Sequence, residues 1–136
     1  MLTSPLQRAA RTAELAGLSA KPEPRLVEWD YGPEEGRTTE QARETRPDWS
    51  VWEDTGLGET LEQLAARQRA VLERVTPVLT AGDDACLVGH GHALRVLAAC
   101  YLGLAPGVAQ QLVLGAGSIS VLGSEHGCPA ILSWNT

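Results

Sequence analysis

His90 is the strongest candidate for chemistry in this 136-residue sequence, because it stands between two glycines where an apolar run gives way to a helical pattern. Ligands of open α/β sheets bind beyond the carboxyl ends of the strands, where the N–H groups of the following helix attract anions. The flanking glycines let the backbone approach such a ligand. The stretch indicates an anion site, although a buried histidine with structural hydrogen bonds explains it equally well.

Arg8 is a second candidate, in the first turn of a helix whose predicted N-cap is Ser4 and whose first helical residue is Pro5. A forked guanidinium beside the positive end of a helix makes a phosphate clamp. Arg11 lies one turn further along and is a near neighbour of Arg8 on the helix surface. A solvated helix face is the alternative explanation for either arginine.

Glu28 is a third candidate, since it closes a predicted strand and enters a glycine-containing loop beside Trp29 and Tyr31. An aromatic wall can raise the pKa of a carboxyl group enough for general-acid catalysis near neutral pH. An exposed loop carboxylate is the alternative.

A metal site would have to draw on His90, His92, His126 and Cys86, but their spacing fits no common metal motif. The sequence therefore predicts neither a metal nor another cofactor. The number of cysteines is odd and two of the three lie in apolar runs, which predicts reduced thiols in a cytoplasmic protein. They are Cys86, Cys100 and Cys128.

The formal net charge of −6 argues against a nucleic-acid partner, because such partners require a basic face. A few placed arginines can still hold a small anionic substrate. No apolar stretch approaches membrane-spanning length and no signal segment opens the chain, so no membrane partner is expected.

The elements that must position these residues alternate between helix and strand, which predicts an α/β layer structure in a single domain over 1–136. Thr38 and Thr60 each begin a capping box. Helices are predicted over 4–17, 38–47, 60–79 and 93–104, and strands over 25–28, 85–88, 118–122 and 130–134, the last two forming a hairpin.

Taken in order, four stretches resemble the motifs of the histidine phosphatase superfamily, also called the phosphoglycerate-mutase-like family. They are SPLQRAARTAEL for its second motif, LVEWDYGPEEG for its glutamate loop, GLGET for its GES segment and LVGHGHALRVL for its second-histidine motif. The resemblance implies a three-layer α/β/α fold with a mostly parallel sheet.

The resemblance also implies a role for each candidate residue. Arg8 would hold the transferred phosphoryl group, His90 would stabilise it, and Glu28 would donate a proton to the leaving oxygen. The backbone N–H groups of Gly91 and His92 would add to the phosphate site.

Two further family positions, Arg95 and Glu59, are expected to support the site rather than react. Thr60 stands where the family often has serine. Only 62 residues separate Glu28 from His90, which resembles the compact acid-phosphatase branch rather than the longer glycolytic mutases.

The family's first motif, an Arg-His-Gly that supplies the nucleophilic histidine, is missing, because no histidine in the sequence follows an arginine. The resemblance thus implies a chain that lacks the family's first strand and first helix, with Met1–Thr3 at the end of the second strand. A start site placed too late and a truncated gene both explain this. Unpaired strand edges would follow, so we expect marginal stability or a homodimer. His92 is not expected to replace the nucleophile.

Two functions remain open at this point. The first is a phosphomonoester hydrolase with a phosphohistidine mechanism, acting on a small phosphorylated substrate and inactive in this form. The second is a catalytically inactive module that binds phosphate or a partner; a phosphoglycerate mutase is a more distant third. The loop that carries Trp49 and Trp52 either walls the substrate pocket or belongs to the core.

Overall fold

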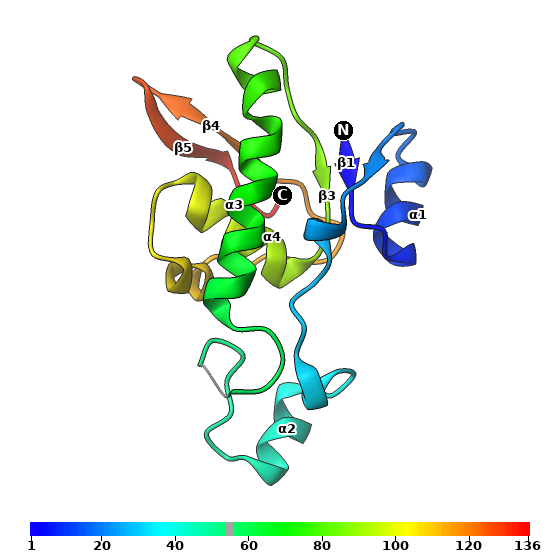
Figure 1. Cartoon of the computed structure of the whole chain (residues 1–136), viewed down its shortest axis with the longest axis vertical. Coiled ribbons are helices and arrows are strands. Elements are labelled where there is room, and N and C mark those ends of the chain that lie inside the picture. Colours follow the sequence, from blue (N-terminus) through cyan, green and yellow to red (C-terminus); the bar gives the residue numbers. More distant parts are fainter. Residues whose placement is uncertain (54–55) are drawn as a thin grey trace.

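The computed structural model describes residues 1–53 and 56–136, and it has an α/β architecture (Figure 1). None of the helices in this part of the chain is long and apolar enough to cross a membrane. The helices are α1 (Gln7–Leu15), α2 (Thr39–Thr45), α3 (Leu61–Thr80) and α4 (Gly91–Tyr101), with 3₁₀ helices η1 (Pro24–Leu26), η2 (Gly32–Glu34) and η3 (Pro106–Gln111). The strands are β1 (Leu2–Thr3), β2 (Lys21–Pro22), β3 (Leu87–Val88), β4 (Val121–Glu125) and β5 (Cys128–Ser133).

The first three strands form a short parallel sheet in the order β2-β1-β3. Leu2 of β1 pairs with Lys21 on one side and with Leu87 on the other. In Figure 1 this sheet lies between α1 and the packed pair α3 and α4. The predicted α/β class with a parallel sheet is therefore confirmed.

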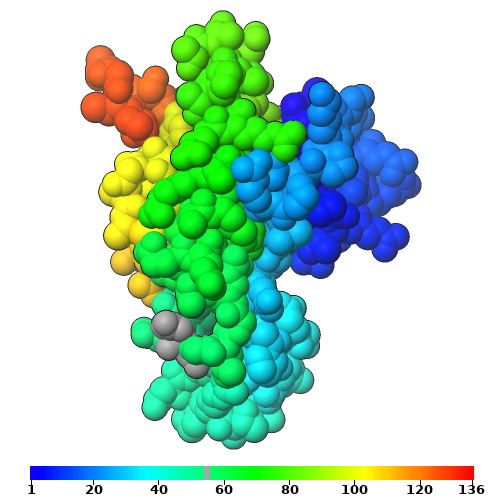
Figure 2. Space-filling view, viewed as in Figure 1, coloured from blue at the N-terminus to red at the C-terminus, as the bar shows by residue number. Residues whose placement is uncertain are grey.

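The last two strands form a separate antiparallel hairpin, as predicted, with the first strand starting three residues later than expected. His126 and Gly127 make its turn in the left-handed region, with φ of 50° and 81°. The Tyr101 hydroxyl donates to the carbonyl of Gly123 and ties the hairpin to the end of α4. Figure 2 shows the hairpin, in orange, projecting from the body of the molecule.

Both predicted capping boxes are present. The Thr60 hydroxyl accepts from the N–H of Gln63, whose side chain accepts in return from the N–H of Thr60 at the start of α3. Thr38 and Gln41 make the same reciprocal pair at the start of α2. These local signals fix two helix starts because each box satisfies two otherwise unpaired N–H groups.

The predicted strand over 25–28 is wrong. Residues Pro24–Leu26 form η1 instead, and the strand that pairs with β1 is β2, just before it. The buried carboxylate of Glu23 accepts from both the backbone and the side chain of Arg25, and this local capping favours a tight turn over an extended strand.

The predicted start of the first helix is also wrong. Helix α1 begins at Gln7 rather than directly after Ser4, and its N-cap residue, Leu6, makes no side-chain capping bond. The Ser4 hydroxyl accepts a longer bond of 3.3 Å from the N–H of Leu6 and faces His90.

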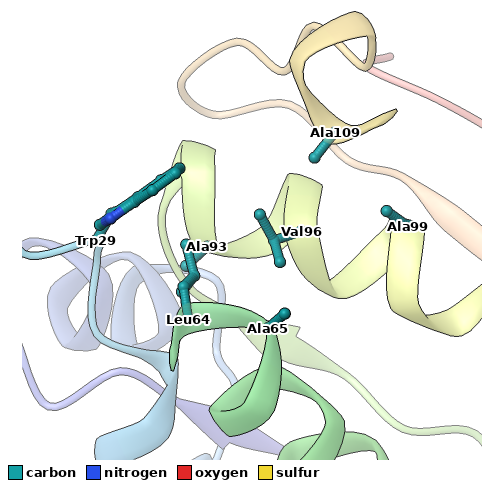
Figure 3. Close-up of a cluster of buried hydrophobic side chains, with 7 residues drawn as sticks. All are labelled: Trp29, Leu64, Ala65, Ala93, Val96, Ala99 and Ala109. Carbon is teal, nitrogen blue, oxygen red and sulfur yellow. The ribbon is translucent and has the colours of Figure 1, made fainter. Parts of the chain in front are cut away.

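Two apolar clusters hold the elements together. The first packs α3 against α4 with small side chains, which lets the two helices approach closely (Figure 3). It comprises Trp29, Leu64, Ala65, Ala93, Val96, Ala99 and Ala109. The second joins the sheet to the same helices and comprises Leu2, Leu26, Val71, Val75 and Leu97.

Candidate functional site

The candidate site lies where β1 and β3 end side by side. The N–H of Ser4 donates to the carbonyl of Val88 at 2.8 Å, so the chain leaving β1 runs beside the chain leaving β3. His90 follows β3 in an extended conformation and is the N-cap residue of α4. Parallel strands thus bring the start of α1 and the start of α4 to one edge of the sheet.

Arg8 and Ser4 hold the His90 ring from both sides. The Nε of Arg8 donates to Nδ1 of His90 at 3.0 Å, and Nε2 of His90 lies 2.9 Å from the Ser4 hydroxyl. Because Nδ1 accepts, the ring proton sits on Nε2 and is donated to Ser4. Burial, and then the charge of Arg8, lower the pKa of His90, so the neutral ring is favoured.

Glu28 supplies the carboxylate at the start of α4. Its Oε1 accepts from the N–H groups of Trp29 and Ala93, both at 2.9 Å, and its Oε2 accepts from the N–H of His92 at 3.2 Å. The side chain of His90 makes no capping bond there, so Glu28 caps α4 from a distant part of the chain. A negative charge is stabilised at this positive helix end.

Arg67 fixes the backbone of Glu28 from the other side. Its guanidinium donates to the carbonyls of Arg25 and Val27, each at 2.7 Å, and to that of Glu28 at 3.0 Å. It also forms a bidentate pair with Glu59 at 2.6 and 2.8 Å. Glu59 therefore pairs with Arg67, and Arg67 in turn holds the backbone of Glu28.

The ring of His92 lies among three aromatic side chains. Its ring makes edge contacts with Trp29, Tyr31 and Trp52, with centroid separations of 6.2, 5.7 and 5.3 Å. The hydroxyl of Tyr31 lies 2.6 Å from Nδ1 of His92. Trp29 and Tyr31 thus make ring contacts with His92, whereas the Glu28 carboxylate is met by backbone N–H groups. Trp52 packs against the first core cluster.

The remaining arginines of the predicted motifs point elsewhere. Arg95 donates to the carbonyls of Ala109 and Gln110 and lies over the ring of Trp52, 4.8 Å from its centroid. Arg11 pairs with Glu14 on the exposed face of α1. Neither takes part in the contacts around His90.

The structure therefore brings Arg8, Glu28 and His90 together at one helix end. A Cβ on Gly91 would lie 4.0 Å from Oε2 of Glu28, so this glycine is close to the carboxylate. The N–H of His92, predicted to bind phosphate, is engaged by Glu28 here. Within residues 1–53 and 56–136, no group of three or more metal-ligating side chains is arranged to hold a metal ion.

Three contributors were not found from the sequence: Ser4 as a partner of His90, Tyr31 as a partner of His92, and Arg67. Arg67 had a usable signal, since its spacing from Leu64 and Val71 places it on the buried side of α3. The two hydroxyl contacts had none, because each joins positions more than 60 residues apart.

Comparison with known proteins gives a consistent set of matches. The family model of the histidine phosphatase superfamily (branch 1) matches residues 1–136. The chain is 34% identical to an acid phosphatase of Mycobacterium tuberculosis over 129 residues, which cover 93% of the chain and 63% of that protein. It is 33% identical over 131 residues to a probable phosphoglycerate mutase GpmB of Yersinia enterocolitica, covering 88% of the chain and 60% of that protein.

Solved structures match as well. That of the Mycobacterium tuberculosis open reading frame Rv3214 superposes with a TM-score of 0.92 at 32% identity, covering 98% of the chain and 70% of that structure. A mycobacterial glucosyl-3-phosphoglycerate phosphatase in complex with inorganic phosphate shares the fold, with a TM-score of 0.82 at 24% identity over 100% of the chain and 76% of that structure. The chain spans about three-fifths of the length of the two curated relatives.

Proposed function

Because this chain belongs to the histidine phosphatase superfamily, we propose that it provides the phosphate-holding and proton-donating part of a phosphomonoester hydrolase. The observation that carries the proposal is the convergence of Arg8, Glu28 and His90 at the start of α4. The expected ligand is a small phosphorylated compound or inorganic phosphate.

Arg8 and His90 would hold the phosphoryl group. The guanidinium of Arg8 is exposed and carries further N–H donors in the fork geometry that suits phosphate oxygens. The neutral ring of His90 offers an N–H on Nε2 that can turn from Ser4 to a phosphoryl oxygen. Preorganised donors of this kind stabilise the charge that develops on a phosphoryl group in the transition state.

Glu28 would act as the general acid. In the first step a histidine nitrogen attacks phosphorus, the bond from phosphorus to the ester oxygen breaks, and Glu28 passes a proton to the departing oxygen. In the second step water attacks the phosphohistidine, Glu28 takes the proton from that water, and inorganic phosphate and free histidine are released.

The attacking histidine is not among His90, His92 and His126 in this proposal, and the sequence contains no Arg-His-Gly triplet. We therefore expect the 136-residue chain to bind phosphate without turning over an ester. Loss of a covalent nucleophile costs at least ~10⁴ in rate. A catalytically inactive phosphate-binding module is the second candidate, favoured by that same missing triplet.

Hydrolysis of p-nitrophenyl phosphate and of phenyl phosphate tests the proposal. We expect turnover only in a version of the chain that carries an N-terminal segment ending in Arg-His-Gly. In that version Glu28→Gln should lower kcat/KM for phenyl phosphate by about 10²-fold or more and for p-nitrophenyl phosphate by less, because the poorer leaving group needs the proton more. Glu14→Gln, on the exposed face of α1, is the matched control and should change neither.

Two results would overturn the proposal. One is turnover by the 136-residue chain that His92→Ala abolishes, which would place the nucleophile inside it. The other is an active extended chain in which Glu28→Gln affects both esters equally, which would remove Glu28 as the proton donor.

A further inference from the structure

A single residue, His92, joins the loop that carries Glu28 to α4 at two points. Its backbone N–H donates to Oε2 of Glu28 at 3.2 Å, and its ring Nδ1 lies 2.6 Å from the hydroxyl of Tyr31, three residues further along that loop. The side chain of Glu28 and the side chain of Tyr31 are therefore both fixed to one turn of helix.

Resting on the proposed function, we propose that Tyr31 and His92 form a latch, a positioning pair that keeps the carboxyl group of Glu28 at the start of α4. The latch does not touch the phosphate site itself: the contacts of His90 run to Arg8 and Ser4 instead. Its effect reaches the site only through Glu28.

The environment of the two groups sets their protonation states. Burial, followed by the charges of Glu28 and Glu35, raises the pKa of Tyr31, so the phenol keeps its proton. Burial lowers the pKa of His92, so its ring stays neutral. In the proposed latch the protonated phenol donates to Nδ1 of the neutral imidazole, an arrangement that puts the proton of His92 on Nε2.

The surroundings make this bond costly to lose. The rings of Trp29 and Trp52 pack against the imidazole in T-shaped contacts, and this environment disfavours an unpaired polar group. A hydrogen bond in such a place is also stronger than one in water. The hydrogen bond can therefore stabilise the position of the loop that carries Glu28.

The loop is anchored on either side of the Glu28 side chain. Before it, Arg67 holds the carbonyl of Val27. After it, Gly32 has a φ of +57°, and a Cβ there would come within 2.7 Å of the backbone nitrogen of Gly58. Trp29 and Asp30 are held by Glu59, and Tyr31 lies directly before the tight contact of Gly32. The bond from Tyr31 to His92 is the contact that ties this end of the loop to α4.

Amide hydrogen exchange in the 136-residue chain tests the latch without any need for turnover. The N–H of Ala93, which donates to Glu28, reports whether the carboxyl group is in place. Tyr31→Phe should speed its exchange about tenfold, the effect of losing one part-buried hydrogen bond. Tyr101→Phe is the matched control, since it removes the bond to Gly123 at the far end of α4, and should leave Ala93 unchanged.

Two substitutions of His92 separate the latch from general packing. His92→Asn puts an oxygen where Nδ1 stood and should keep the slow exchange of Ala93, whereas His92→Gln places its oxygen further out and should behave like Tyr31→Phe. If Tyr31→Phe or His92→Gln unfolds, the exchange rate of Ala93 in the other variant is compared with that in His92→Asn, and this comparison still tests the latch. The exchange of a core amide such as that of Val71 shows whether the whole molecule has loosened.

The latch is overturned if Ala93 exchanges at the same rate with and without the Tyr31 hydroxyl, or if Ala93 and Val71 speed up together. In an active extended chain, Tyr31→Phe should lower kcat for phenyl phosphate several-fold and leave KM unchanged. Failure of turnover in every form would count against the proposed hydrolase and leave the exchange result standing.

Discussion

Arg8 and His90 lie 82 residues apart in the chain and are joined by a hydrogen bond of 3.0 Å from Nε of the arginine to Nδ1 of the histidine. This contact places the guanidinium cation of Arg8 against the buried, neutral ring of His90. Burying a charge there is unfavourable unless the ring accepts a hydrogen bond from the guanidinium. Because Nδ1 accepts from Arg8, Nε2 of His90 carries the proton. That proton points to Ser4, where, in the proposed function, a phosphoryl oxygen would bind.

Arg8→Gln should raise the pKa of His90. Burial lowers that pKa most and the charge of Arg8 lowers it further, so removing the charge moves it back toward 6.5. The same change should let both ring tautomers appear. Nitrogen-15 NMR of the histidine ring measures both effects, and Arg11→Gln, whose charge pairs with Glu14, should alter neither.

Stability should fall as the pH drops below 6.5. His90 and His92 both have pKa values lowered on folding, chiefly by burial, so the unfolded chain binds protons first and acid favours unfolding. Between about pH 7.5 and about pH 5.5 we expect a loss of about 1–2 kcal/mol in urea unfolding. Glu23, whose pKa is held at about 2 chiefly by the Arg25 side chain, acts only below its ordinary value of 4.5.

The matched variants locate this pH effect. His126→Gln, at the exposed tip of the hairpin, should leave the loss unchanged. His90→Asn should reduce it by about half. If His90→Asn loses as much unfolding free energy over this pH range as the parent, groups other than His90 are responsible for the pH dependence.

Gly58→Ala should destabilise the chain by about 2–4 kcal/mol. Gly58 has a φ of +68°, and a Cβ there would come within 2.4 Å of the carbonyl oxygen of Asp30 and 2.6 Å of the nitrogen of Gly32. Two of the predicted motifs, the glutamate loop and the segment before α3, meet at this point backbone to backbone. Gly36 also has a left-handed backbone, with a φ of +76°, but a Cβ there would meet open space. Gly36→Ala should therefore cost only about 1 kcal/mol of stability. Chemical denaturation of both variants gives the comparison; equal losses would mean that the close approach contributes nothing.

Arg67→Lys should cost about 1–3 kcal/mol. A lysine keeps the charge but cannot serve the Glu59 carboxylate and three carbonyls at once, so buried acceptors lose their donors. Arg69→Lys, two positions on and about half exposed, should stay within about 0.5 kcal/mol of the parent. Urea unfolding of the two variants side by side is the test, and the account of Arg67 is wrong if they behave alike.

The parts of the fold that follow from short-range rules were predictable. Thr60 with Gln63 and Thr38 with Gln41 each close a capping box within four residues, so sequence alone locates both helix starts. The hairpin also follows from a local turn, at His126.

What the sequence could not supply depends on contacts between distant segments. Ser4 looks like an N-cap residue in sequence, yet its hydroxyl meets His90, 86 positions away. The stretch 25–28 has strand-like residues, but the Arg25 contacts with Glu23 and with the α3 carbonyl of Ala70 turn it into a 3₁₀ helix. Contacts with distant segments determine the local structure at these positions, and the periodicity of the sequence does not predict such contacts.

Titration of the 136-residue chain with inorganic phosphate, followed by nitrogen-15 shifts of arginine and histidine side chains, tests most directly whether Arg8, Glu28 and His90 form an anion site. We predict saturable shifts at Nε of Arg8 and at the His90 ring, and affinity at least about tenfold weaker in Arg8→Gln. Arg25 and Arg74, which surround the buried carboxylate of Glu23, provide the competing cationic pair. Shifts confined to that pair, or none at Arg8 and His90, would contradict the account.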